Sequence, residues 1–422
     1  MATKLKRELG LLETTFYGVG VILGAGIYAL IGKAAGLAGN AVWAAFAIGA
    51  FISAFTGLSY AELSSMFPKA GGEYVYTEKA FNRRLAFLIG WLIVIGGVVA
   101  AATVSLGFGG YFSAIFHTPV IPAAIVLIIL LSFLSFWGIK ESAIANIIGT
   151  VVEAGGLILI ILFGLKHLGS VNYFELPSIG FSGILSATAL IFFAFLGFES
   201  IVRLSEETKN PTITIPKALI LSIIISTIMY ISVAIAAVSV VGWQALSQSS
   251  APLALVAQTA FGPKAFFALS VIALFATFNT VLVTLIATSR MLYGMAENHG
   301  LPKILSEVHK KFRTPWLAIT ITGILSAIFA LIGKIEVVAG LTDFALFTTF
   351  ALVNLSLLWL RHKQPKTKRP FKTWAPLSAI GAISSFAMLI YLEKWIILGG
   401  VLMIITGFLI YELINKKYKK RK

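Results

Sequence analysis

The sequence has no cysteine and little charge. Among its 422 residues there is no Cys, and Asp, Glu, Lys and Arg together make up 12%, about half of the roughly 25% typical of soluble domains. The missing cysteines exclude disulfides and thiol chemistry. The five histidines form no metal-ligand or catalytic spacing, so we expect no metal and no other cofactor. With 58% hydrophobic residues and a mean hydropathy of +0.94, the composition predicts a polytopic membrane protein.

Long polar segments and catalytic constellations are also missing. The largest loops, near 242–264 and 293–314, are each only about 20 residues long, so residues 1–422 are expected to form one integral membrane domain. The apolar segments hold no paired acids, histidine cluster or serine–lysine pair, which argues against an intramembrane enzyme. They also lack the rings of polar residues that a channel needs. Transport is therefore favoured, with solute sensing by a transporter fold as an alternative.

Twelve apolar runs have the length of a membrane-spanning helix, about 20 residues each. They fall near residues 12–35, 41–66, 85–113, 120–138, 143–166, 182–203, 216–241, 265–292, 315–333, 336–360, 374–392 and 395–414. Because lipid offers no hydrogen bonds to the backbone, these runs predict an all-α bundle of about 12 transmembrane helices.

The formal net charge of +16 resembles that of a nucleic-acid-binding protein, but its distribution argues against this. With a cytoplasmic N-terminus, 28 of the 33 lysines and arginines fall on the cytoplasmic side. This asymmetry is a positive-inside signal. It predicts a multi-pass protein of the cell membrane with both termini in the cytoplasm and no nucleic-acid partner. The basic tail at 416–422 is also suited to contact anionic membrane lipid.

Two of the spans contain glycines where a helix would be expected to continue. The first reads FYGVGVILGAGIYALIG, and the sixth reads IFFAFLGFESI, with an acid two residues after its glycine. Such interruptions in corresponding positions of two halves indicate the binding site of a transporter built from inverted repeats. The repeats would cover about 10–167 and 180–361, with two further helices at about 374–414. Close helix packing is the alternative for these glycines, and we assign it to GGVVAAATVSLGFGG and to Gly155 and Gly156.

Four motifs occur in order along the chain, and together they resemble the amino acid–polyamine–organocation (APC) superfamily of secondary transporters. They are GVILGAGIY, SYAELSSMFPKAGGEYVYTEKAF, FFAFLGFESI with SEETKNPTITIPKAL, and ATSRMLYGMAENHGLPKILSEVHKKFRTP. The resemblance covers essentially the whole chain. It implies a five-plus-five inverted repeat, the LeuT-like fold, in which helices 1 and 6 are unwound in the middle of the membrane.

The resemblance also implies a site for an amino acid substrate at the two unwound segments. A helix N-terminus offers free N–H groups to a carboxylate, and free carbonyl groups accept from an ammonium group. The implied carboxylate ligands are the amides of Ala25, Gly26 and Ile27. The implied amino-group ligands are the carbonyls of Ile22, Phe193 and Leu196, beside Gly197, with the Phe193 ring as a lid on the extracellular side.

Coupling to an ion is expected, and the residues leave its identity open. Some proton-coupled relatives carry a lysine in span 5, and Glu153 occupies that position here. A carboxyl group in mid-membrane is reluctant to ionise and can carry a proton, so we predict proton coupling through Glu153, with Glu199 second. For each acid the alternative is a structural hydrogen bond. The resemblance also implies an alternative, because sodium-coupled relatives use the backbone near Gly20 and Leu23 with hydroxyl groups of span 8, where Phe278 and Asn279 stand here.

Transport of neutral L-amino acids is the preferred function, because no charged side chain other than Glu199 falls in the motif positions that would face substrate. Amino acid or amine exchange, and permeation of cationic amino acids or polyamines, are alternatives. Glu62 is expected to contact a loop at the cytoplasmic end of span 2. Asp343 in span 10 is either a gate residue or a residue near the outer surface.

Overall fold

The computed structural model describes residues 9–68, 72–137, 143–297 and 301–419. These residues form helices and connecting loops, with no β-strand among them. Several basic residues of the predicted charge asymmetry lie outside the described residues: Lys4, Lys6, Arg7, Lys69, Lys140 and 420–422.

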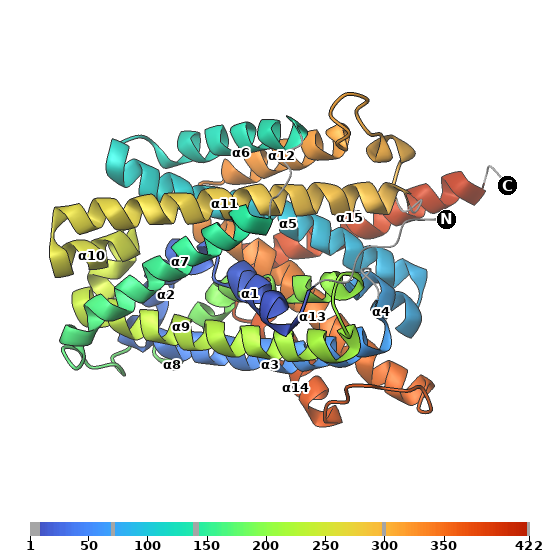
Figure 1. The fold of residues 1–422 in the computed structure, drawn as a ribbon, viewed down its shortest axis with the longest axis horizontal. Coiled ribbons are helices and arrows are strands. Elements are labelled where there is room, and N and C mark those ends of the chain that lie inside the picture. The colour runs from blue at the N-terminus through green and yellow to red at the C-terminus, as the bar shows by residue number, and fades with distance from the viewer. Residues whose placement is uncertain (1–8, 69–71, 138–142, 298–300, 420–422) are drawn as a thin grey trace.

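The helices pack into one bundle, with the long helices running side by side (Figure 1). In chain order they are α1 (Leu11–Ile22), α2 (Ala25–Ala38), η1 (Gly39–Ala41), α3 (Val42–Met66), α4 (Gly72–Ala80), α5 (Arg83–Phe116), α6 (Val120–Trp137), α7 (Ala143–Gly164), η2 (Leu165–His167), α8 (Phe181–Ile191), η3 (Phe192–Phe195), η4 (Phe198–Glu206), α9 (Pro211–Gln248), α10 (Pro252–Phe261), α11 (Pro263–Glu297), η5 (Lys303–Ser306), α12 (Trp316–Ala330), α13 (Ile335–Lys363), α14 (Ala375–Leu389) and α15 (Lys394–Lys419).

Within the described residues, nine helical stretches are long and apolar enough to cross a membrane. This agrees with a polytopic membrane protein. Helices α12 and α14, with 15 residues each, match predicted spans but are shorter than a full crossing. The total of twelve crossings and the inverted repeat therefore remain predictions. The predicted first and sixth spans are each divided, one into α1 and α2, the other into α8, η3 and η4.

Small residues let the central helices approach closely. A Cβ on Gly107 of α5 would lie 2.7 Å from Ala29 of α2, and a Cβ on Gly97 would lie 2.2 Å from the Thr288 hydroxyl of α11. The prediction that glycines of the α5 run pack against neighbouring helices is confirmed at these positions. It is wrong for Gly155 of α7, where a Cβ would meet nothing within 4 Å.

The two ends of the bundle differ in their contacts. We call the end where α1 begins and α15 ends the inner end, because the charge pattern predicts that it is cytoplasmic, and the opposite end the outer end (Figure 1). At the outer end, the Lys33 ammonium of α2 lies 3.7 Å from the Glu336 carboxylate of α13. Nearby, the Glu175 carboxylate accepts hydrogen bonds from the Asn40 amide and the Trp243 indole N–H, each at 3.0 Å. These contacts hold the outer ends of α2, α9 and α13 in place.

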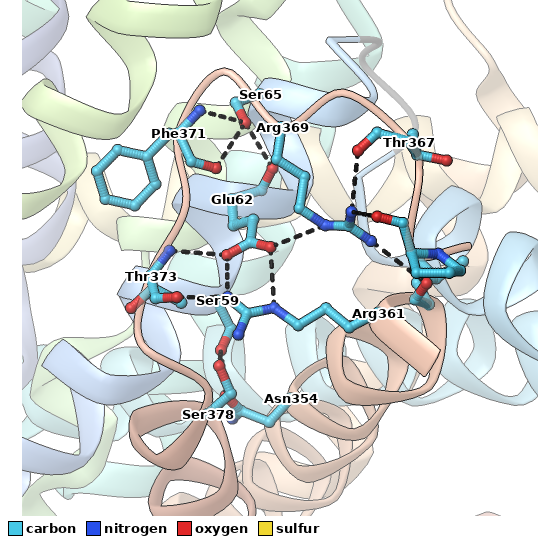
Figure 2. A network of polar contacts seen from close by, with 12 residues as sticks. Ser59, Glu62, Ser65, Asn354, Arg361, Thr367, Arg369, Phe371, Thr373 and Ser378 are labelled. Atoms are coloured by element: carbon cyan, nitrogen blue, oxygen red, sulfur yellow. Dashed lines mark hydrogen bonds and ion pairs between the residues drawn. The ribbon is translucent and has the colours of Figure 1, made fainter. Parts of the chain in front are cut away.

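At the inner end, a buried ionic network joins α3, α13 and the segment 364–374 (Figure 2). The Glu62 side chain is fully buried, and its carboxylate accepts hydrogen bonds from the Arg361 guanidinium and, at 2.8 Å, from the Thr373 backbone N–H. Arg369 pairs with the same carboxylate at 3.2 Å and donates to the Gln364 carbonyl at the end of α13. The prediction that Glu62 contacts a loop is confirmed.

Candidate functional site

The first break lies between α1 and α2. Helix α1 ends at Ile22, Gly24 has an extended ψ of −162°, and α2 begins at Ala25. The first N–H groups of a helix have no intrahelical partner. The Ala25 N–H donates to the Thr280 hydroxyl of α11 at 3.3 Å, whereas no described residue accepts from the N–H groups of Gly26 and Ile27. The break therefore presents the positive end of a helix dipole and free amide donors.

The second break lies between η3 and η4. Leu196 is extended, with a ψ of 135°, and Gly197 has a φ of 119°. A residue with a side chain rarely adopts this positive φ. A Cβ on Gly197 would also lie 2.4 Å from the Val21 side chain of α1. Glycine is required at this position by backbone conformation and by the close approach of α1.

The two breaks are joined directly. A Cβ on Gly26 would lie 2.7 Å from the Cα atom of Ala194, so α2 contacts the backbone of η3 at this point. The Tyr230 hydroxyl of α9 shares its hydrogen between the carbonyl oxygens of Ile22 and Ala194, the latter at 2.7 Å. One tyrosine thus connects the end of α1 to η3.

A cavity of about 170 Å³ adjoins both breaks and extends from them toward the inner end. Its lining residues come from α1, α2, α4, α5, α7, η3, η4, α11, α13 and the residues at the breaks. The apolar lining includes Leu92, Ile93, Ala100 and Val104 from α5, Val283, Ala287 and Met291 from α11, and Ala345 and Leu346 from α13. A small molecule with an apolar side chain fits these surroundings.

Most of the residues predicted from the sequence line this cavity. They are Gly20, Ile22, Ala25, Gly26, Glu153, Phe193, Leu196, Gly197, Glu199 and Asn279. Ile27 and Leu23 are buried beside the first break but do not line the cavity. Phe278 lies elsewhere, in an apolar groove with Phe108 and Pro122.

The predicted ligands for an amino group differ in their hydrogen bonding. The Ile22 carbonyl accepts from Tyr230, and the Phe193 carbonyl accepts from the Leu196 N–H at 3.1 Å. No described residue donates to the Leu196 carbonyl oxygen. Because a carbonyl oxygen has two lone pairs, the first two can still accept a second donor. The Gly197 N–H is already used, because it donates to the Glu199 carboxylate at 2.9 Å.

Three acids line the cavity, and each has different surroundings. Glu199 is hydrogen-bonded to the backbone of its own broken helix, which was the structural alternative for this residue. Glu73 of α4 accepts from the Tyr60 hydroxyl at 3.2 Å. Glu153 of α7 is 2% exposed and is hydrogen-bonded by the Asn279 side chain, while its Oε1 atom has no partner among the described residues. Glu153 is therefore the acid with spare bonding capacity.

The span 8 register predicted for an ion site is off by one residue. Thr280, rather than Phe278, provides the hydroxyl group at the first break, where it accepts from the Ala25 N–H. Asn279, the other span 8 residue named for a possible ion site, lines the cavity together with Glu153. Since adjacent residues on a helix point about 100° apart, Phe278 cannot face the break when Asn279 and Thr280 do.

Several lining residues were not predicted from the sequence. Glu73 lies within the motif that ends in GGEYVYTEKAF. Its place in that motif was the one feature of the sequence that could have indicated a role at the site. Gly96 and Gly97 were assigned only to packing, yet both line the cavity as well. The lining residues of α11 and α13, such as Thr284 and Thr349, are ordinary residues of apolar helices. No local pattern in the sequence distinguishes them.

Comparison with known proteins decides the family. The profile of the amino acid permease family matches residues 9–413. The chain belongs to the amino acid permease family. This permease is 30% identical to the branched-chain amino acid permease of Bacillus subtilis (strain 168), over 99% of this chain and 94% of the relative.

Other relatives are named for different substrates. The methylthioribose transporter of Bacillus subtilis (strain 168) is 28% identical, over 98% of this chain and 94% of its own. Cationic amino acid transporter 4 of Mus musculus is 29% identical, over 86% of this chain and 61% of its own. The resemblance to the APC superfamily is thereby confirmed. The permease is a multi-pass membrane protein of the amino acid transporter type.

Proposed function

We propose that this permease moves neutral L-amino acids with apolar side chains across the cell membrane by alternating access, coupled to protons through Glu153. The single observation that carries the proposal is the cavity at the two helix breaks, with free N–H groups on one side and an apolar lining beyond them. The N–H groups of Gly26 and Ile27 suit a carboxylate at a helix N-terminus. The Leu196 carbonyl suits an α-ammonium group, and the α5 and α11 side chains suit the substrate side chain.

The proposed mechanism uses the five-plus-five inverted repeat. Its supporting observations are the two broken segments, one at the start of each predicted repeat, and their direct contact at Gly26 and Ala194. In the described arrangement the outer ends of α2 and α13 lie together, with Lys33 beside Glu336, and the cavity extends toward the inner end. Transport requires a second arrangement in which the outer end opens. While the outer end is closed, the Phe193 ring would separate substrate from the outer side.

Proton coupling is supported by the position of Glu153. Its carboxyl group is buried against the cavity, and one oxygen has no partner in the described part of the chain. An acid in such surroundings favours its neutral form unless a cation or water joins it. The first break also carries a span 8 hydroxyl group, that of Thr280, of the kind a sodium site would use, so the proposal of a proton over sodium rests on the position of Glu153 alone.

The test is uptake of labelled leucine, alanine and arginine into proteoliposomes, with a pH gradient, a sodium gradient or neither. We expect saturable leucine or alanine uptake that a proton gradient drives and that sodium does not alter. A strict sodium requirement would contradict the coupling. Uptake that never exceeds exchange for internal amino acid would show an exchanger instead.

A second candidate function is permeation of cationic amino acids. It is favoured by the three acids on the cavity wall and by the mouse relative named for cationic substrates. Competition separates the candidates. Unlabelled leucine should inhibit alanine uptake at concentrations where arginine and a polyamine do not. Inhibition by arginine and the polyamine at concentrations where leucine has no effect would establish permeation of cationic amino acids.

A further inference from the structure

Asp343 of α13 is buried without a partner. The side chain is 0% exposed, and neither carboxyl oxygen has a hydrogen-bond partner among the described residues. The adjacent Thr342 hydroxyl is also buried and unpartnered in that part of the chain. Burying an ionised carboxylate without compensation is costly, so this arrangement suits the neutral acid. Of the two interpretations of the sequence, a gate residue or a residue near the outer surface, the structure adds that the side chain is not exposed to the outer side.

Asp343 does not line the cavity but lies beside residues of α13 that do. Thr342, next to it, and Leu346, one turn further along, both line the cavity. Phe347, also one turn along, packs against Phe192 of η3 with ring centroids 4.5 Å apart. Residues three and four apart share one face of a helix, so Asp343 lies on the side of α13 between the cavity-lining Leu346 and Phe347, which contacts η3.

No charged side chain lies beside Asp343 in the helices packed against it. Helices α8, η3 and α14 contain no titratable residue, and the outer half of α5 contains only Tyr111, which donates to the Tyr28 carbonyl. Helix α3 contributes Tyr60 and Glu62, and α4 contributes Glu73, Tyr74, Tyr76, Glu78 and Lys79, all near the inner end. Helix α2 contributes Tyr28, whose hydroxyl donates to the Glu153 carbonyl, and Lys33 at the outer end. The outer end also holds Lys334 and Glu336 at the start of α13, Tyr391 and Glu393 before α15, and Lys394 at its start. The inner end holds Arg83 and Arg84 of α5, Arg361, His362 and Lys363 of α13, and Tyr411 and Glu412 of α15. Among the described residues, the carboxyl group therefore has no counter-charge that would explain its place.

We propose that Asp343 is a second proton-binding site of this permease, and that the outer end can close only when Asp343 carries a proton. Opening would separate α2 from α13, break the Lys33–Glu336 pair and let water reach Asp343. Water stabilises the ionised form, so loss of the proton favours the open arrangement. Closing returns the side chain to surroundings with no partner and therefore requires the neutral acid. The proposal rests on the alternating-access part of the proposed function.

Cysteine labelling tests this without transport. Because the chain has no cysteine, Ala339→Cys gives a single thiol. Ala339 is 0% exposed, one turn toward the outer end from Asp343, and packs in the cluster that contains Leu30 of α2. A membrane-impermeant maleimide is applied from the outer side between pH 5 and 8. Each rate is divided by the rate for the same protein denatured at the same pH, which removes the effect of thiol ionisation.

We expect the corrected rate to rise with pH, by up to tenfold per unit for a single linked proton. In the Asp343→Asn background it should stay at the low-pH value throughout, because the amide is always neutral. Glu336→Gln is the matched control. It should raise labelling at every pH through loss of the outer ion pair, while the dependence on pH remains.

Three results would overturn the proposal. The first is labelling that does not depend on pH in the Ala339→Cys protein. The second is a pH dependence that survives Asp343→Asn or disappears in Glu336→Gln. The third is failure of both Asp343→Asn and Asp343→Leu to fold, which would show an essential partner for the carboxyl group. Failure of the proposed transport function would appear separately, as absent uptake in proteoliposomes of the natural protein.

Discussion

The Tyr230 hydroxyl donates to the Ala194 carbonyl oxygen at 2.7 Å and shares its hydrogen with the Ile22 carbonyl. Both carbonyls lie where a helix is interrupted, so they lack the partners that a continuous helix would supply. The tyrosine is fully buried in α9. This contact connects the broken helices that form the cavity.

Tyr230→Phe should therefore destabilise the protein by about 1–3 kcal/mol, because two buried carbonyl oxygens lose a donor. It should also weaken substrate binding, since the two breaks are no longer joined. Thermal unfolding and equilibrium binding of labelled substrate on the same purified protein measure both effects. Tyr391→Phe near the outer end is the control. Equal effects of the two substitutions would contradict a special role for Tyr230.

Gly26→Ala should lower stability by about 1–3 kcal/mol, because its Cβ would lie 2.7 Å from the Ala194 Cα and the backbone would have to move. Gly24→Ala should cost less, since its nearest contact is the Thr280 hydroxyl at 3.1 Å. Gly155→Ala in α7 meets nothing within 4 Å and should gain up to about 1 kcal/mol. Thermal unfolding of the three variants gives this order. If Gly26→Ala kept normal stability but lost substrate binding, Gly26 would serve substrate binding and not the packing against Ala194.

Glu153→Gln should abolish accumulation driven by a pH gradient and leave substrate binding and exchange intact. The physical reason is that the amide keeps the shape and the contact with Asn279 but cannot carry a proton. Uptake and counterflow in the same proteoliposome preparation separate the two activities. Glu307→Gln, an exposed acid between η5 and α12, is the control. Undiminished proton-driven uptake by Glu153→Gln would reject coupling through this residue.

Glu62→Gln should lower stability by about 3–5 kcal/mol, because Arg361 and Arg369 would lose their buried counter-charge. Glu412→Gln removes an exposed pair with Arg84, in which both side chains are about half exposed, and should change stability by no more than about 1 kcal/mol. Thermal unfolding with and without added salt compares the two. Similar losses for both variants would contradict a buried ionic network at the inner end.

The sequence by itself determined the class of protein, its predicted orientation and the place of the two breaks. Hydrocarbon cannot hydrogen-bond the backbone, so long apolar runs must be helical. Glycine is required where backbones approach closely or φ is positive, so the interruptions in the first and sixth spans could be recognised before any contact was known. Gly197, with its φ of 119°, is the clearest example.

Only the tertiary structure decided which side chains meet at the site. The lining residues of α5, α11 and α13 sit in ordinary apolar helices, and their direction depends on helix rotation, which one sequence does not specify. This is why Phe278 was predicted at the first break and Thr280 was missed, although they are two residues apart. For the same reason, the sequence left two interpretations of Asp343 open, a gate residue or a residue near the outer surface. Whether a carboxyl group faces water, a partner or neither depends on the neighbouring helices, and here they leave it buried and unpartnered among the described residues.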